Sequence, residues 1–244
     1  MMNDYLITLA LAALPALGNF LGGLLAEFFR TSQRTLSIAL HGAAGVVLAV
    51  VAVELMPQAL KAAAPWIIIL AFLAGGGLFM VVDALLDVVG SRYGGEKGQA
   101  GPWMIFFGVS VDLFSDGIMI GAGSTLSFGL GLLLALGQVP ADIPEGFATI
   151  AAFKARGVPR RTRLLAAAAF ALPIFLGTTI GYFGVRGRPE VVKLALLAFT
   201  AGMLTTVTVE EIVPQAHQGK ETKQATFAFI IGFALFTFLS VYLD

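Results

Sequence analysis

Long apolar runs separated by short polar breaks are the feature that most constrains the fold of this chain. Eight such runs can be drawn, and each has about the 20 residues that a helix needs to cross a bilayer. They cover residues 5–28, 36–57, 66–89, 103–124, 126–153, 164–184, 191–213 and 224–243. The breaks are too short to hold a soluble domain. The pattern predicts an all-α integral membrane protein, with residues 1–244 forming one transmembrane domain of eight spanning helices.

Composition supports a membrane fold and argues against several other classes. Hydrophobic residues make up 58% of the 244 positions and charged residues 12%, whereas soluble domains average about 45–50% and about 25%. The absence of cysteine excludes disulfides and thiolate metal sites, and a net charge of +0 argues against a nucleic-acid partner. The first residues, MMNDYLITLALAAL, lack a basic start and a small-residue cleavage site. They are therefore predicted to begin the first span and not to form a removable signal peptide.

The distribution of Lys and Arg predicts the orientation of the chain. The breaks after the first, third, fifth and seventh runs hold eleven basic residues, and the other side of the membrane would hold four. Because basic residues are retained on the cytoplasmic side, the first set is predicted to be cytoplasmic. The prediction is a multi-pass protein of the cell (inner) membrane with both termini outside.

Two segments of the sequence resemble each other at a constant offset. AGVVLAVVAVELMPQA begins at Ala44 and AGMLTTVTVEEIVPQA begins at Ala201. The shared residues include Glu54 with Glu211, Pro57 with Pro214 and Gln58 with Gln215. The two runs cross the membrane in opposite directions, so the repeat is inverted, as in many secondary transporters. A weaker similarity, ALPALG and ALPIFLG, links the first and sixth runs. The repeat predicts a 3+2+3 arrangement, with the fourth and fifth spans as a central pair.

Four acidic residues lie inside the central pair. Asp112 and Asp116 are four apart in SVDLFSDG, and Asp142 and Glu145 are three apart in ADIPEG. Each pair therefore lies on one face of its helix. An Asp at the centre of a spanning helix costs on the order of 2.5–3.5 kcal/mol on the insertion scale. Such residues usually face a bundle interior and often belong to an ion or proton pathway. The alternative is that these acids only make structural hydrogen bonds between helices.

The chemistry of these acids favours a cation. Four carboxylates in a low-dielectric interior require protons or a positive ion to neutralise them. An all-oxygen set suits Mg²⁺, Ca²⁺, Mn²⁺ or Fe²⁺, whereas imidazole and thiolate suit zinc and copper better. Pro140 and Pro144 also release the carbonyls of Leu136 and Pro140 as further oxygen ligands. The sequence therefore predicts a divalent metal ion as transported substrate and no tightly bound cofactor.

Other polar residues are candidates for the ion pathway. Glu54 and Glu211 lie near the ends of their spans and are either mouth acids or solvated helix-end acids. His41 and His217 lie on the predicted cytoplasmic side and, with Glu211, could form an exit relay. Gln138, one turn before Asp142, is a candidate neutral ligand, and Asp83 and Asp87 are expected to be solvated. The chain has no Walker loop, no HExxH motif and no serine-protease motif, so no enzyme is predicted.

The motifs HGAAGVVLAVVAVELMPQAL, DLFSDGIMIGA, DIPEGFA and VEEIVPQAH resemble those of the ZIP family of divalent-metal transporters. The resemblance covers the whole chain. It implies eight spans with both ends outside, a 3+2+3 inverted repeat and transport of Zn²⁺, Fe²⁺, Mn²⁺ or Cd²⁺ into the cytoplasm. The lipid bilayer and the metal ion would be its partners, and a homodimer is common in the family.

The resemblance also assigns site residues and shows where this chain departs from the family. Asp116 takes the place of the acid in the fourth span, and Asp142 and Glu145 take the places of the two in the fifth. The departures are Asp112 at the usual metal-binding His, Leu113 at the usual Asn, Ala141 at a common Gln or His, and Ile174 at the acid that many bacterial members carry in the sixth span.

These departures predict one metal site, built from Asp112, Asp116, Asp142 and Glu145. Without an imidazole the site is expected to prefer Mn²⁺, Fe²⁺ or another harder ion to Zn²⁺. Transport is expected to proceed by rocking of the two halves around the central pair. Two other functions stay open: a proton-coupled carrier of another cation or small solute, and a non-transporting membrane sensor or partner subunit.

Overall fold

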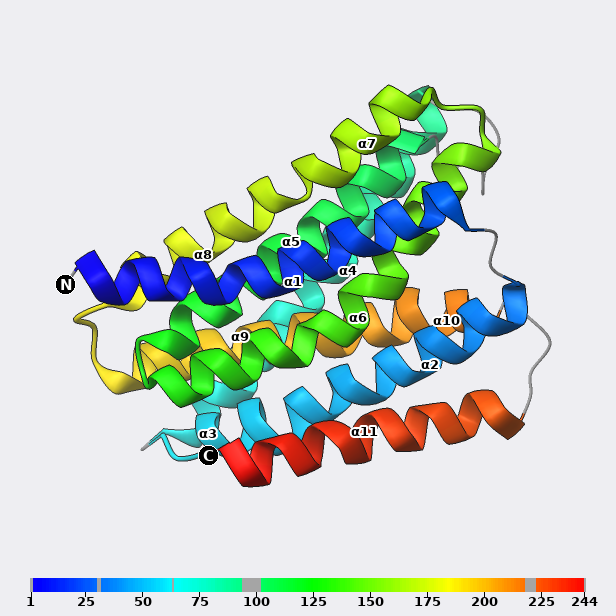
Figure 1. The fold of residues 1–244 in the computed structure, drawn as a ribbon. Coiled ribbons are helices and arrows are strands. Elements are labelled where there is room, and N and C mark those ends of the chain that lie inside the picture. The colour runs from blue at the N-terminus through cyan, green and yellow to red at the C-terminus, as the bar shows by residue number, and fades with distance from the viewer. Residues whose placement is uncertain (1, 30–31, 63, 94–101, 218–222, 244) are drawn as a thin grey trace.

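The computed structural model describes residues 2–29, 32–62, 64–93, 102–217 and 223–243, and almost every residue of the predicted apolar runs is helical. Figure 1 shows long helices that lie side by side, with both chain termini at the same end of the molecule. We call this end the terminal end and the opposite one the basic end. No β-strand occurs within the described ranges.

The helices follow the chain in the order of the predicted spans, with two of them broken into shorter segments by π-helical turns. The elements are α1 (Met2–Phe28), α2 (Gln33–Ala49), η1 (Val50–Leu55), α3 (Met56–Ala59), α4 (Pro65–Tyr93), α5 (Pro102–Ser124), α6 (Phe128–Ala155), α7 (Arg160–Ala169), α8 (Ala171–Val185), α9 (Glu190–Val207), η2 (Thr208–Ile212), α10 (Val213–Ala216) and α11 (Lys223–Leu243).

Seven of the described helices are long and apolar enough to cross a membrane, counting consecutive segments as one. The chain is therefore an all-α membrane protein. The helix outside this set is α6, which carries Gln138, Asp142, Glu145 and two internal prolines in place of apolar residues. Its 28 residues are enough in length, but its composition is too polar for the same assignment. The count of eight spans thus stays a prediction that depends on α6.

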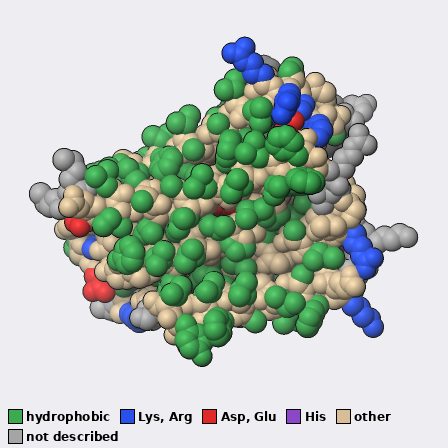
Figure 2. Space-filling model, viewed as in Figure 1, with side chains coloured by type: hydrophobic (Ala, Val, Ile, Leu, Met, Phe, Trp, Pro, Cys, Tyr) green, Lys and Arg blue, Asp and Glu red, His purple; other side chains and the backbone are tan. Residues whose placement is uncertain are grey.

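The surface agrees with this assignment. Figure 2 shows hydrophobic side chains over the middle of one face, with Lys and Arg gathered at the basic end. The large exposed apolar residues include Leu6, Trp66, Leu73, Phe183 and Phe238. A soluble monomer rarely exposes so many large apolar side chains over one face, whereas a helix bundle in a bilayer must expose them to lipid.

The two π-helical segments lie at equivalent places in the sequence repeat. Segment η1 holds Glu54 and ends two residues before Pro57, and η2 holds Glu211 and ends two residues before Pro214. Proline has no backbone N–H and therefore removes one hydrogen bond from the preceding turn. A π-helical turn inserts an extra residue into the helix and is common at functional sites. The sequence predicts continuous helices here, and the structure shows instead that each repeated glutamate lies in a widened turn.

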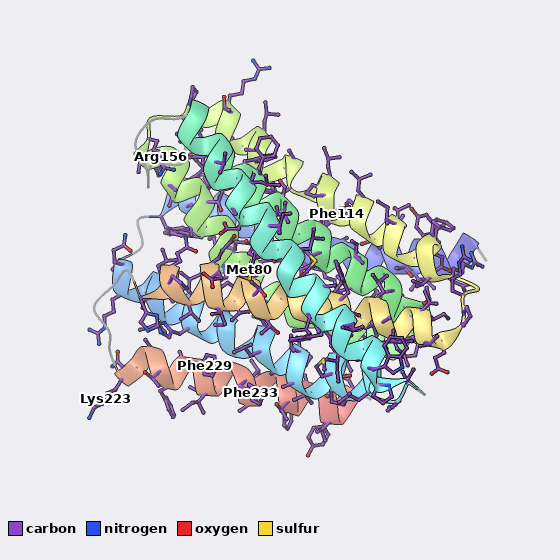
Figure 3. All side chains as sticks on the ribbon, turned by 180° about the vertical axis from the view of Figure 1, so that it is seen from behind. Met80, Phe114, Arg156, Lys223, Phe229 and Phe233 are labelled. Atoms are coloured by element: carbon purple, nitrogen blue, oxygen red, sulfur yellow. The ribbon has the colours of Figure 1, made fainter. Side chains whose placement is uncertain are left out.

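Glycines bring particular helices into backbone contact. A Cβ added to Gly45 of α2 would lie 2.9 Å from the carbonyl carbon of Phe229 on α11, and one added to Gly202 of α9 would lie 2.9 Å from that of Phe72 on α4. Gly45 and Gly202 are separated by the same offset as Phe72 and Phe229. Figure 3 shows Phe229 on α11, which runs beside α2. Contacts at equivalent positions of the repeat therefore match, and the 3+2+3 arrangement itself remains a prediction.

A second set of glycine contacts joins the remaining helices. A Cβ on Gly146 of α6 would lie 2.8 Å from the carbonyl carbon of Asn19 on α1, and one on Gly117 of α5 would lie 3.0 Å from that of Ile174 on α8. The backbone-packed pairs are therefore α1 with α6, α5 with α8, α2 with α11, and α4 with α9. Each pair combines helices from different parts of the predicted repeat.

The four pairs associate into two bundles. In the first, Tyr5 of α1 and Thr179 of α8 share a 2.8 Å hydrogen bond that joins α1–α6 to α5–α8. In the second, the rings of His41 and His217 lie 4.9 Å apart and join α2 to α10, which continues α9. The first bundle thus contains α1, α5, α6, α7 and α8. The second contains α2, α3, α4, α9, α10 and α11, with the two π-helical segments.

Gly45→Ala is expected to destabilise the fold, because its Cβ would meet the backbone of α11, which cannot move aside as a flexible side chain can. Overpacking of this kind typically costs about 1–3 kcal/mol, which lowers the melting temperature of a chain this size by at least about 2 °C. Thermal melting in detergent measures the effect. Gly77→Ala on α4, where a Cβ would meet nothing within 4 Å, is the matched control. Equal melting temperatures for the two variants would contradict the packing described above.

Candidate functional site

Helices α5 and α6 place the four predicted acids in the interior of the molecule. The exposed fractions of Asp116 and Asp142 are 1%, that of Asp112 is 7%, and Glu145 is half-buried. Because the spacings of four and three residues put each pair on one helix face, both faces meet where α5 packs beside α6. The structure therefore places the four acids in the interior between α5 and α6, and their function as one metal site stays a prediction.

The charges of these acids act on one another. Asp142 interacts electrostatically with Asp116 and Asp112, and Glu145 interacts with all three aspartates. Repulsion between carboxylates in a low-dielectric interior is strong. A bound cation would remove this repulsion and also supply the buried oxygens with a partner.

Gln138 belongs to the same cluster. It is 1% exposed, and its Nε2 donates a hydrogen bond to Oδ1 of Asp116. Its Oε1 is buried and has no hydrogen-bond partner. The predicted neutral ligand therefore has its amide nitrogen engaged by Asp116 and its amide oxygen available.

Buried oxygens without hydrogen bonds gather around this cluster. In the described ranges five buried side-chain atoms have no partner, and all five lie on α1, α5 and α6. Ser124 Oγ is at the last residue of α5, and the other four are Asn19 Oδ1, Asp112 Oδ1, Gln138 Oε1 and Asp142 Oδ2. An unsatisfied buried polar atom costs about 1–3 kcal/mol, so a group of them on neighbouring helices requires an explanation. A divalent cation that prefers oxygen ligands would provide one.

The carboxylates by themselves do not make up a coordination sphere. Within the described part of the chain, no three side chains from His, Cys, Asp and Glu converge closely enough to hold one metal ion. A metal site in this region would need amide oxygens, or rotation of the carboxylates toward a common point.

Glu211 and Asp83 extend the cluster toward the second bundle. Glu211, in η2, is half-buried and interacts electrostatically with Asp112, Glu145 and Asp83. Its expected alternative role as a solvated helix-end acid is therefore wrong. Asp83 on α4 is half-buried, where the sequence indicates a solvated residue. The side chain of Asp87 lies outside the described part of the structure.

Glu54 lies at the corresponding place in the other repeat. It is 4% exposed, and Ser240 of α11 donates a hydrogen bond to its Oε1. It is therefore not a solvated helix-end acid. Ser240 is related to Asp83 by the same offset that relates Glu211 to Glu54. Because Ser240 is the repeat equivalent of Asp83, the sequence repeat could have indicated that Ser240 lies beside Glu54. A single serine in an apolar helix is not by itself a signal of such a contact.

The two histidines lie together at the basic end. Nδ1 of His41 is 2.8 Å from the carbonyl oxygen of Ser37, and Nδ1 of His217 is 2.7 Å from that of Val213. A carbonyl oxygen can only accept, so both Nδ1 atoms carry protons. His41 is nearly buried, whereas His217 is exposed. The structure brings the two predicted relay residues into contact, and their role in exit stays a prediction.

Two positions where the chain departs from the ZIP pattern are packed in the core. Leu113 and Ile174 are both 0% exposed and belong to one apolar cluster with Phe170 and Val109. Neither can supply a ligand.

The residue that sequence reasoning missed is Asn19 of α1. It is 0% exposed, and its Nδ2 donates to Oε2 of Glu145 at 3.4 Å.

Comparison with known proteins identifies relatives of the whole chain and of part of it. The family model described as "ZIP Zinc transporter" matches residues 95–240. Zinc transporter ZupT of Shigella dysenteriae serotype 1 (strain Sd197) is 27% identical over 252 residues, which cover 98% of this chain and 96% of that protein. Zinc transporter ZIP6 of Homo sapiens and that of Pongo abelii are each 28% identical over 113 residues, or 46% of this chain. The matched part is 15% of the length of those two proteins.

Proposed function

The chain belongs to the ZIP zinc transporter family, and from this we propose that it is a secondary transporter that carries a divalent metal cation across the cell membrane. The observation that carries the proposal is the group of buried carboxylates and unpartnered oxygens on α5 and α6. Acids at membrane depth usually face an ion pathway. Both its relatives and its lack of known catalytic motifs support a carrier and not an enzyme.

The proposed substrate site consists of Asp112, Asp116, Asp142 and Glu145, with Gln138 as a neutral ligand. These residues offer only oxygen atoms, and oxygen ligands favour Mn²⁺, Mg²⁺ or Fe²⁺ over Zn²⁺. Asp112 contributes most to this preference, because it stands where the family usually has an imidazole. The metal ion is cargo and not a resident cofactor.

The proposed direction is into the cytoplasm, with the basic end inside and both termini outside. The Lys and Arg residues gathered at the basic end support this orientation. Glu211, Asp83, His41 and His217 would then lie on the exit side of the site, and Glu54 on the entry side. The exposed apolar side chains would face the lipid of an inner membrane, and a homodimer is part of the same proposal.

The proposed motion differs from rocking of the two sequence repeats. Two backbone-packed pairs, α2 with α11 and α4 with α9, unite helices of the two halves, and the other two pairs unite one half with the central pair. Rocking of the halves around the central pair would therefore disturb all four pairs. The two bundles, by contrast, meet through side chains: Ser115 Oγ donates to Met203 Sδ at 3.6 Å, and the side chains of Val50 and Phe236 pack at Gly137. Flexible Met side chains tolerate rearrangement. We therefore propose that the first bundle, which holds the site, moves against the second.

The test is uptake by the purified chain in sealed liposomes, with Mn²⁺, Fe²⁺, Zn²⁺ and Mg²⁺ supplied separately and protein-free liposomes as the control. Accumulation of Mn²⁺ or Fe²⁺ above Zn²⁺ is the expected result. A flux driven by a pH gradient and indifferent to divalent ions would instead indicate a proton-coupled carrier of another solute. Absence of any flux would indicate a sensor or partner subunit.

A further inference from the structure

We propose that Asn19 of α1 is a specificity-determining residue of this site, which contributes its amide oxygen as a neutral ligand to a divalent cation. The inference rests on the proposed function, because it names one more residue of the same site. Sequence reasoning places no ligand on α1, and the residue stands alone in an apolar stretch, ALGNFLGGLL.

The orientation of the Asn19 amide follows from its one hydrogen bond. Its Nδ2 donates to Oε2 of Glu145 on α6 at 3.4 Å. The NH₂ group therefore faces Glu145, and the amide oxygen points elsewhere. That oxygen is buried and has no partner in the described structure. An asparagine with one buried, unsatisfied oxygen beside an acid is costly to keep in an apolar helix.

The oxygen of Asn19 belongs to a wider set on three helices. Oδ1 of Asp112, Oε1 of Gln138 and Oδ2 of Asp142 are likewise buried and without partners. Together with Asn19 they provide two carboxylate and two amide oxygens, a mixture that divalent cations such as Mn²⁺, Mg²⁺ and Ca²⁺ accept. No three acidic or histidine side chains in the described ranges converge on one point, and neutral oxygens such as that of Asn19 would complete a site that those side chains do not form by themselves.

Packing alone does not require an amide at position 19. Asn19 lies against Gly146 on α6 in the same way that Ile174 lies against Gly117 on α5. The surrounding sequences match as well, with NFLG at 19–22 and IFLG at 174–177. Ile174 is 0% exposed, so an apolar side chain fills the equivalent position. The polar residue on α1 therefore has a purpose other than filling the space between two helices.

The competing role of Asn19 is purely structural, because its Nδ2 hydrogen bond to Glu145 alone could stabilise the packing of α1 against α6. Two substitutions separate the roles. Asn19→Leu removes both the donor and the oxygen, whereas Asn19→Asp removes the donor and keeps a ligand oxygen. If Asn19 is only structural, both variants should bind the metal ion equally weakly. If Asn19 is a ligand, only Asn19→Leu should bind it more weakly.

The experiment measures equilibrium binding of ⁵⁴Mn²⁺ and ⁶⁵Zn²⁺ to the full chain in detergent. Asn19→Leu is expected to weaken Mn²⁺ binding by about tenfold, at the lower end of what a change around a metal ligand produces, and to lower the Mn²⁺ to Zn²⁺ affinity ratio. Asn19→Asp should bind Mn²⁺ at least as tightly as the unmodified chain. Thr8→Val is the matched control, because Thr8 is a buried polar residue of α1 whose hydroxyl donates to the backbone oxygen of Asp4.

Each outcome decides the inference. Binding by Asn19→Leu equal to that of the unmodified chain, or equal impairment of the Leu and Asp variants, overturns it. If Asn19→Leu does not fold, as judged by gel filtration, Asn19→Ala takes its place with the same expectation. Failure of the unmodified chain to bind any divalent ion would overturn the proposed function itself, which distinguishes the two failures.

Discussion

Replacing Asp116 and Glu145 together with alanine is expected to abolish accumulation of divalent metal in liposomes. Changes to residues that only support metal ligands typically lower affinity about 10–100-fold, so loss of two direct ligands should lower uptake by at least about 100-fold. The two residues come from different helices, α5 and α6, and both interact electrostatically with the other acids of the cluster. The initial rate of ⁵⁴Mn²⁺ uptake provides the measurement.

The control for this double variant is Asp4→Ala with Glu190→Ala. It also removes two acids, but both are exposed and lie at helix starts. Its uptake should equal that of the unmodified chain. Retained uptake in the Asp116–Glu145 variant, with correct folding shown by gel filtration, would mean that the ion does not pass between α5 and α6.

Asp112→His is expected to change which metal the chain accepts. An imidazole is a softer ligand than a carboxylate and favours Zn²⁺, whereas Mn²⁺ favours oxygen. The uptake ratio of Zn²⁺ to Mn²⁺ should rise on the order of tenfold, since a change of this size is common around metal ligands. Competition between the two ions in one uptake assay measures the ratio directly.

Asp4→His is the matched control for this substitution, because it adds the same imidazole at an exposed acid far along the chain from the cluster. It should leave the ratio unchanged. If Asp112→His lowers uptake of both ions by the same factor, Asp112 supports the fold or the pathway, and the choice of metal lies with other residues.

The helices and the central acids could be predicted from the sequence because both follow from local physics. Apolar runs of spanning length have almost no alternative to a helix in a bilayer, and buried acids such as Asp116 are too costly to be incidental. The same reasoning set the ends of α5 to within one residue. It missed the break at Phe170 between α7 and α8, which comes three residues before Pro173.

Two features depended on which helices become neighbours, and no local pattern reveals this. The pairing of the helices follows from glycines such as Gly22 and Gly75, whose backbone contacts are with helices distant in sequence. Asn19 was missed and Asp83 was wrongly expected to be solvated for the same reason, because the role of a single polar residue becomes clear only when the helix opposite it is known. The π-helical turns at Glu54 and Glu211 likewise required the backbone itself.

The unequal partners of Glu54 and Glu211 have a consequence for reversibility. At the terminal end a glutamate is held by the hydroxyl of Ser240, whereas at the basic end its counterpart faces the charge of Asp83. In a transporter built from an inverted repeat, each end takes up in turn the closed arrangement of the other during a cycle. Closing the basic end as the terminal end is closed would bring Glu211 and Asp83 together. Such closure is favourable only with positive charge between them. The carrier is therefore expected to act as a rectifier, which transports faster in one direction than in the other. The rate of its return step would depend on the supply of cations or protons on a single side of the membrane.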